Sequence, residues 1–123
     1  MKFELDSVRS GPVIRSYEGD CVIVGDARLE EPFVLTPDGI RIGLLPAEYT
    51  ALSRKHLEAV AATGAQVVLV GSGRRQIFLD PGIIAEMGAR GVGVEVMGTA
   101  AACRCYNVLA SEHRAVAAVL YIS

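Results

Sequence analysis

The feature that most constrains the fold is an alternation of apolar runs and helical segments that begins near residue 66. The apolar runs are dense in Val, Leu and Ala, which is typical of strands covered on both faces. The segments between them carry helix start and stop signals. This order predicts strands over 66–70, 92–97 and 115–122, with helices over 81–90 and 100–110. Because strand–helix–strand units close by right-handed crossovers, we expect a central, largely parallel sheet with helices packed on it.

Capping residues mark where the helices start and stop. Asp80 precedes the first predicted helix and Thr99 the second, and both residue types are favoured as N-caps. An earlier helical period covers about 47–63, and Ser53 could cap a shorter version of that helix. Gly64 follows it and can end it in the left-handed conformation that glycine adopts without strain.

The first half of the chain has short β-prone runs instead. They cover 13–17, 21–24, 33–36 and 40–44. Turn signals separate the members of each pair, namely Glu18-Gly19-Asp20 and Pro37-Asp38-Gly39. The spacing predicts a meander of small strands.

Length and composition favour one globular domain over residues 1–123. The chain is 51% hydrophobic and 21% charged, so it can bury a core. Its formal charge of −2 disfavours nucleic acid as a partner, because non-specific binding to phosphates needs a basic field.

Cysteine usage and the first residues bear on the compartment. The three cysteines, Cys21, Cys103 and Cys105, are an odd number in a core-rich chain, which favours a reducing compartment over a disulfide framework. Residues 1–11 lack the apolar run of a secretory signal and are too acidic for an organellar transit peptide. No stretch approaches the roughly 18 apolar residues of a membrane helix. We therefore expect a cytoplasmic protein without membrane insertion.

The first candidate site is the glycine turn Gly71-Ser72-Gly73, followed by Arg74 and Arg75. A dinucleotide-binding fingerprint needs a third glycine at position 76, which is Gln76, and a helix that starts at once. Two interpretations stay open. The turn is a plain surface turn, or its amides and arginines bind a ligand at the carboxyl edge of the sheet.

The second candidate is the run from Met97 to Asn107, MGTAAACRCYN. With Thr99 as cap, the helical wheel directs Cys105 toward the sheet and Cys103 about 200° away. Cys103 would then lie near the positive end of a helix, beside Arg104, where a thiolate is favoured. It is either a reactive nucleophile or a structural thiol. Neither histidine stands at ligand spacing from a cysteine, so we expect no zinc or other metal site and no cofactor.

Glu95 interrupts an otherwise apolar predicted strand. It is either on a solvent face or a buried carboxylate, with Arg74 or Arg104 as its partner. We assign no catalytic residue. The candidate pocket at this sheet edge comprises Gly71, Ser72, Gly73, Arg74, Glu95, Thr99, Cys103 and Arg104.

Several separated motifs, in order, resemble the domain-of-unknown-function family 498/598, also called the Mth938-like domain. They are VVLVGSG over 67–73, GVGVEVM over 91–97, Thr99, Ala101-Ala102-Cys103-Arg104 and Tyr106-Asn107. The resemblance covers nearly the whole chain. It implies an α/β fold of three layers, with a mixed central sheet and an additional β-layer from the N-terminal half.

The same resemblance implies no catalytic activity. The family includes an assembly factor of mitochondrial NADH:ubiquinone oxidoreductase (respiratory complex I), so it implies a binding or assembly domain that acts through protein partners such as respiratory complex subunits or other assembly factors. Gly98 stands where the family has aspartate, and Cys105 where it has threonine. Two alternatives stay open: a small-ligand domain or enzyme that uses 71–75, Glu95 and 99–104, and a homo-oligomer.

Overall fold

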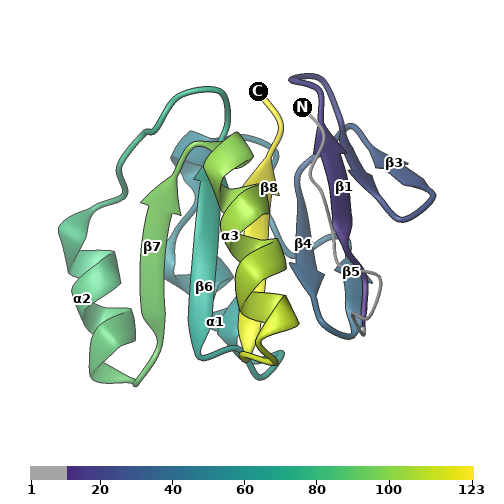
Figure 1. Ribbon diagram of the computed structural model, residues 1–123. Coiled ribbons are helices and arrows are strands. Elements are labelled where there is room, and N and C mark those ends of the chain that lie inside the picture. The colour runs from purple at the N-terminus through teal and green to yellow at the C-terminus, as the bar shows by residue number, and fades with distance from the viewer. Residues whose placement is uncertain (1–10) are drawn as a thin grey trace.

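The computed structural model describes residues 11–123, which form two sheets and three α-helices (Figure 1). The expectation that the N-terminus carries no targeting signal concerns residues 1–10, which lie outside the described residues. The larger sheet has the strand order β5-β4-β8-β6-β7. Its strands are β4 (Phe33–Thr36), β5 (Gly39–Arg41), β6 (Val67–Ser72), β7 (Gly93–Met97) and β8 (Val116–Tyr121).

This central sheet is mixed. Strand β6 pairs in parallel with both β7 and β8, whereas β4 pairs antiparallel with β5 and β8. The mixed sheet that the family resemblance implied is confirmed. The parallel part is limited to β6 and its neighbours β7 and β8, so the sheet is less parallel than the order of strands and helices predicted. The helices between the later strands predicted the parallel pairing of β6 with β7 and β8. The residues of β4 and β5 were assigned to the N-terminal meander, because these runs are short and a tight turn joins them.

The second sheet has the order β1-β2-β3 and consists of β1 (Ile14–Tyr17), β2 (Val22–Val24) and β3 (Ala27–Leu29). All its pairings are antiparallel. Two buried polar contacts join it to the rest of the chain. Asn107 accepts from the backbone N–H of Ile14 at 3.0 Å and donates to its carbonyl at 2.8 Å, and the Tyr17 hydroxyl donates to the Ile122 carbonyl at 2.6 Å.

The helices lie on opposite faces of the central sheet. Helices α1 (Arg54–Ala61) and α2 (Pro81–Ala89) cover one face, and α3 (Thr99–Ser111) packs on β6 and β8 on the other (Figure 1). Sheet β1-β2-β3 shares the face of α3. Strand residues alternate between the two cores: Leu69 faces α3, whereas Val68 and Val70 face α1 and α2.

Most element ends follow the capping signals. Asp80 accepts a hydrogen bond from the Gly82 N–H at the start of α2, and Ser53 forms a capping box with His56 at the start of α1. The helix predicted over 47–63 is shorter, because a 3₁₀ turn over Tyr49–Ala51 precedes the Ser53 cap. Gly64 has the expected left-handed φ of 104°.

Candidate functional site

The carboxyl end of β6 is tied to the start of α3 by one side chain. The Thr99 hydroxyl accepts from the Gly73 N–H at 2.8 Å and donates to the Tyr121 carbonyl. The Thr99 N–H in turn donates to the Gly73 carbonyl at 2.8 Å. Thr99 is fully buried and lies inside the helix, and Gly98 is the N-cap. The prediction that Thr99 caps the helix was therefore wrong, because its hydroxyl bonds across the sheet edge instead.

Two glycines make this contact sterically feasible. A Cβ on Gly71 would lie 2.9 Å from the Thr99 hydroxyl oxygen and 3.0 Å from its Cα. Gly73 has a φ of +106°, which is strained for other residues. Gly71 and Ser72 belong to β6 and are buried, so the prediction of a loop at these two residues was wrong. We call Gly71, Gly73, Thr99 and Tyr121 the Thr99 junction.

The five residues that follow, Arg74 to Phe78, form an exposed segment that we call the Arg74–Phe78 loop. Hydrogen bonds to neighbouring parts of the protein hold the backbone of this loop. The Ser72 hydroxyl donates to the Arg75 carbonyl at 2.6 Å and accepts from the Ile77 N–H at 2.9 Å. The Tyr49 hydroxyl donates to the Ile77 carbonyl, and Gln76 donates to the Val96 carbonyl at 2.9 Å. These bonds hold the loop in place while its side chains stay in solvent.

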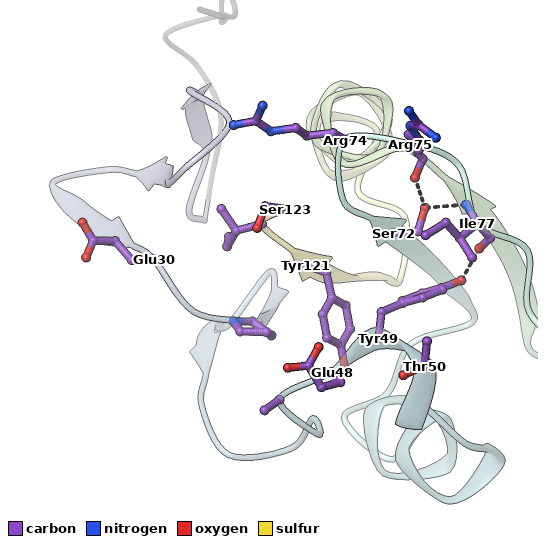
Figure 2. Close-up of a pocket in the computed structure, with 13 residues that line it drawn as sticks. Glu30, Glu48, Tyr49, Thr50, Ser72, Arg74, Arg75, Ile77, Tyr121 and Ser123 are labelled. Atoms are coloured by element: carbon purple, nitrogen blue, oxygen red, sulfur yellow. Dashed lines mark hydrogen bonds between the residues drawn. The ribbon is translucent and has the colours of Figure 1, made fainter.

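A pocket of about 510 Å³ opens between this loop and the segment before α1 (Figure 2). Tyr49 and Tyr121 form its wall, with ring centroids 5.4 Å apart in an edge-to-face arrangement. The Tyr121 hydroxyl donates to the Pro46 carbonyl at 2.8 Å. The remaining lining residues are Glu30, Pro32, Ala47, Glu48, Thr50, Ser72, Arg74, Arg75, Ile77, Ile122 and Ser123.

The charges around the pocket are segregated. Arg74 crosses one rim, and its guanidinium lies 3.5 Å from the Gly19 carbonyl (Figure 2). Arg75 is exposed on the same side. Glu48 and Glu30 border the other parts of the pocket. The pocket therefore has a cationic rim and an anionic rim, with an aromatic wall between them.

The inward face of α3 differs from the predicted one. Its buried residues are Thr99, Ala102, Cys103, Tyr106 and Asn107. Cys103 is 0% exposed in the core, so the prediction that it points away from the sheet was wrong. Cys105 is only partly buried, although it packs against the same core. The error came from placing the apolar stripe on Ala101 and Cys105. The true stripe includes Thr99 and Asn107, whose polar atoms find buried partners.

Burial also changes the chemistry of Cys103. It raises the pKa of the thiol to about 12, although the nearby Arg104 lowers it in part. A thiol with such a pKa stays protonated at neutral pH and is a poor nucleophile. Of the two alternatives, the burial of Cys103 and its raised pKa favour the structural thiol over the reactive nucleophile.

The eight predicted site residues do not gather in one place. Gly71, Gly73 and Thr99 meet in the junction, and Ser72 and Arg74 line the pocket. Cys103 lies in the core, while Glu95 and Arg104 are exposed. Because Glu95 is exposed, it lies on the solvent face of its strand and is not a buried carboxylate.

Sequence reasoning missed the aromatic wall. Tyr121 ends a strand at the carboxyl edge of the sheet, and this position could have indicated that it lines a site there. Tyr49, by contrast, lay within a stretch assigned to a helix. Within residues 11–123, no group of three or more His, Cys, Asp or Glu side chains could hold a metal ion, and no helix is long and apolar enough to cross a membrane.

These elements define a class, a mixed α/β fold with two sheets and three helices. A solved Mth938-like domain from Bordetella pertussis has this fold, with a TM-score of 0.78 and 26% identity over 99% of this chain and 92% of that one. The model of the family described as protein of unknown function (DUF498/DUF598) matches residues 14–121. The chain belongs to this family.

The relatives of this chain include proteins with descriptive names, two of which are similar to it over part of their length. The chain is 47% identical over 55 residues to the NADH dehydrogenase [ubiquinone] 1 alpha subcomplex assembly factor 3 of Xenopus tropicalis, which is 45% of this chain and 30% of that protein. It is 30% identical over 70 residues to the 13 kDa major membrane protein of Francisella tularensis, covering 57% of each. The matched part thus spans less than two thirds of either relative.

Proposed function

We propose that this chain is a non-enzymatic binding domain that acts in the assembly of a respiratory complex through protein partners. The observation that carries the proposal is the 47% identity over 55 residues to an assembly factor of NADH dehydrogenase. The geometry is compatible with it. The thiol weighed as a nucleophile, Cys103, is buried, and burial raises its pKa to about 12, while an apolar and cationic loop is presented to solvent.

Deleting the gene in the native host tests this function. We expect the amount of assembled NADH:ubiquinone oxidoreductase to fall on native gels, with free subunits or subcomplexes accumulating, and the plasmid-borne gene to restore it. Normal assembly in the deletion strain would contradict the proposal. The expected cytoplasmic location can be checked in the same strains by fractionation, with the tagged chain recovered in the soluble cytoplasmic fraction.

A second candidate function is the binding of a small ligand at the sheet edge. The pocket of about 510 Å³, which Ser72 and Arg74 line, supports this candidate. A pocket of this volume is within the range of small-molecule sites. Native mass spectrometry of the protein purified from its host distinguishes the two. A stoichiometric small molecule that is lost when Thr50 and Tyr49 are replaced would favour the ligand.

A further inference from the structure

The Arg74–Phe78 loop presents two neighbouring apolar side chains to solvent. Phe78 is 75% exposed and Ile77 is 48% exposed. The other exposed large apolar side chains in the described part of the chain, Ile42 and Val108, stand alone. Single exposed apolar residues are common, but two that follow each other on an anchored backbone give this loop apolar area that a partner can cover.

The charge of this loop is opposite to that of the whole chain. Residues 73–79 include Arg74 and Arg75 and no carboxylate, although the formal charge of the protein is −2. The loop therefore attracts acidic groups that most of the surface repels. Exposed arginine beside an aromatic side chain is also the composition typical of energetically important interface residues.

The pocket beside the loop adds a concave surface. Ile77 belongs to both, and the wall of Tyr49 and Tyr121 lies next to it (Figure 2). The side chain of a protein segment can enter such a pocket, whereas a flat bilayer surface cannot. The arginine rim and the Glu48 rim give the pocket a polarity, so a bound segment would have one favoured direction.

We propose that the Arg74–Phe78 loop and the adjoining pocket form the docking site for an acidic segment of a partner protein that also carries apolar side chains. The carboxylates of the segment face Arg74 and Arg75, and its neutral or basic end lies toward Glu48. One apolar side chain contacts Ile77 at the pocket, and another covers the exposed Phe78 on the loop. This inference rests on the proposed function, because it names the surface through which an assembly partner binds.

An anionic membrane is a weaker match to the same surface. Recognition of acidic lipids usually needs clusters of four to eight basic residues, each worth about 1 kcal/mol near the surface. The loop has two arginines, in a chain that is acidic as a whole. A second copy of this chain and a membrane are therefore outcomes that the test must separate from an acidic partner.

Photo-crosslinking in the native host tests the proposal. The photoreactive amino acid p-benzoylphenylalanine replaces Phe78 in one strain and Ile42, which is 69% exposed on another part of the surface, in a control strain. We expect illumination to link position 78 to one protein, at a peptide with more Asp and Glu than Lys and Arg. Position 42 should give no such product. Adding Arg75→Glu should lower the yield about tenfold or more, as expected for an interface residue of high importance.

A matched charge change controls for the net charge of the protein. Arg41→Glu changes the same charge at another exposed arginine and should leave the crosslink yield unchanged. Four results would overturn the proposal: crosslinks to phospholipid, crosslinks to a second copy, crosslinks to a peptide without acidic excess, or a yield insensitive to Arg75→Glu. The deletion strain tests the proposed function separately. If that strain fails to assemble the complex, any of these four results contradicts only the docking site, and the proposed function is retained.

Discussion

The Arg74–Phe78 loop directly follows Gly73 of the Thr99 junction, yet the two regions are opposite in character. In the junction the Thr99 hydroxyl and N–H have partners in the backbone of Gly73 and Tyr121, and Gly71 leaves no room for a Cβ. In the loop the backbone is anchored while Arg75, Ile77 and Phe78 stay exposed. The comparison indicates that the junction maintains the fold and that the loop is available for binding. Substitutions in the two regions should therefore separate stability from partner binding.

The largest loss of stability is expected for Gly71→Val. The new side chain would overlap Thr99 and Leu120, whose atoms lie 2.9 to 3.1 Å from the position that a Cβ on Gly71 would take. Overpacking of a tight site costs about 3 kcal/mol, and urea unfolding measures it. Gly88→Ala is the matched control, because nothing lies within 4 Å of its Cβ position in helix α2. It should stabilise the protein by about 0.5 kcal/mol or more. Equal effects at both glycines would refute the close-packed junction.

The next largest effect is expected for Thr99→Val. This change keeps the shape of the side chain but leaves the Gly73 N–H and the Tyr121 carbonyl without their partner. Leaving buried polar groups unpaired costs about 2 kcal/mol or more. Thr99→Ser retains the hydroxyl, so it should lower the free energy of unfolding clearly less than Thr99→Val in the same experiment. A Thr99→Val protein as stable as the wild type would show that the junction does not need this hydroxyl.

The buried thiol predicts a loss of stability at alkaline pH. The pKa of Cys103 rises from its ordinary value of 9.0 to about 12 in the fold, so the unfolded chain ionises first. The stabilising contribution is complete below pH 9 and is lost as the pH rises toward 12. Comparing unfolding at pH 8 and pH 10, the drop should be about 1 kcal/mol smaller in Cys103→Ala than in the wild type. The same drop in both would contradict a buried, protonated thiol.

The smallest effect on stability is expected for Tyr106→Phe. The Tyr106 hydroxyl is buried and has no hydrogen-bond partner within the described residues. Removing it should leave the stability unchanged or increase it by about 1 kcal/mol, because an unpaired buried hydroxyl is unfavourable. Tyr17→Phe is the contrasting variant. It loses a bond to the Ile122 carbonyl and should cost about 1 kcal/mol. A marked destabilisation by Tyr106→Phe would reveal a partner for the hydroxyl.

Most of the order of helices and strands could be predicted from the sequence, because caps and apolar runs are local signals. Asp80, Ser53 and Gly64 act at helix ends as predicted. The antiparallel pairing of β4 with β8 was missed, since it joins segments far apart in the chain. The short strand β3 was missed as well, because it has no apolar run of its own.

The candidate site was harder to predict than the fold. A helical wheel built on apolar residues alone placed Cys105 inside, because it took Thr99 as the cap and left Asn107 out of the buried stripe. Both are buried through hydrogen bonds to distant backbone groups, which a single sequence does not reveal. The pocket wall likewise combines Tyr49 and Tyr121 from separate parts of the chain. Its existence depends on long-range packing.

The most direct test of the separation between junction and loop is the amount of partner protein retained per folded chain by a variant with Arg75→Glu and Phe78→Ser. Both side chains are exposed, so the thermal midpoint should stay close to that of the wild type. We expect the retained partner, quantified after affinity purification from the native host, to fall about tenfold or more. Two results would contradict the account: the variant retains as much partner as the wild type, or it retains less partner only because part of the variant is unfolded.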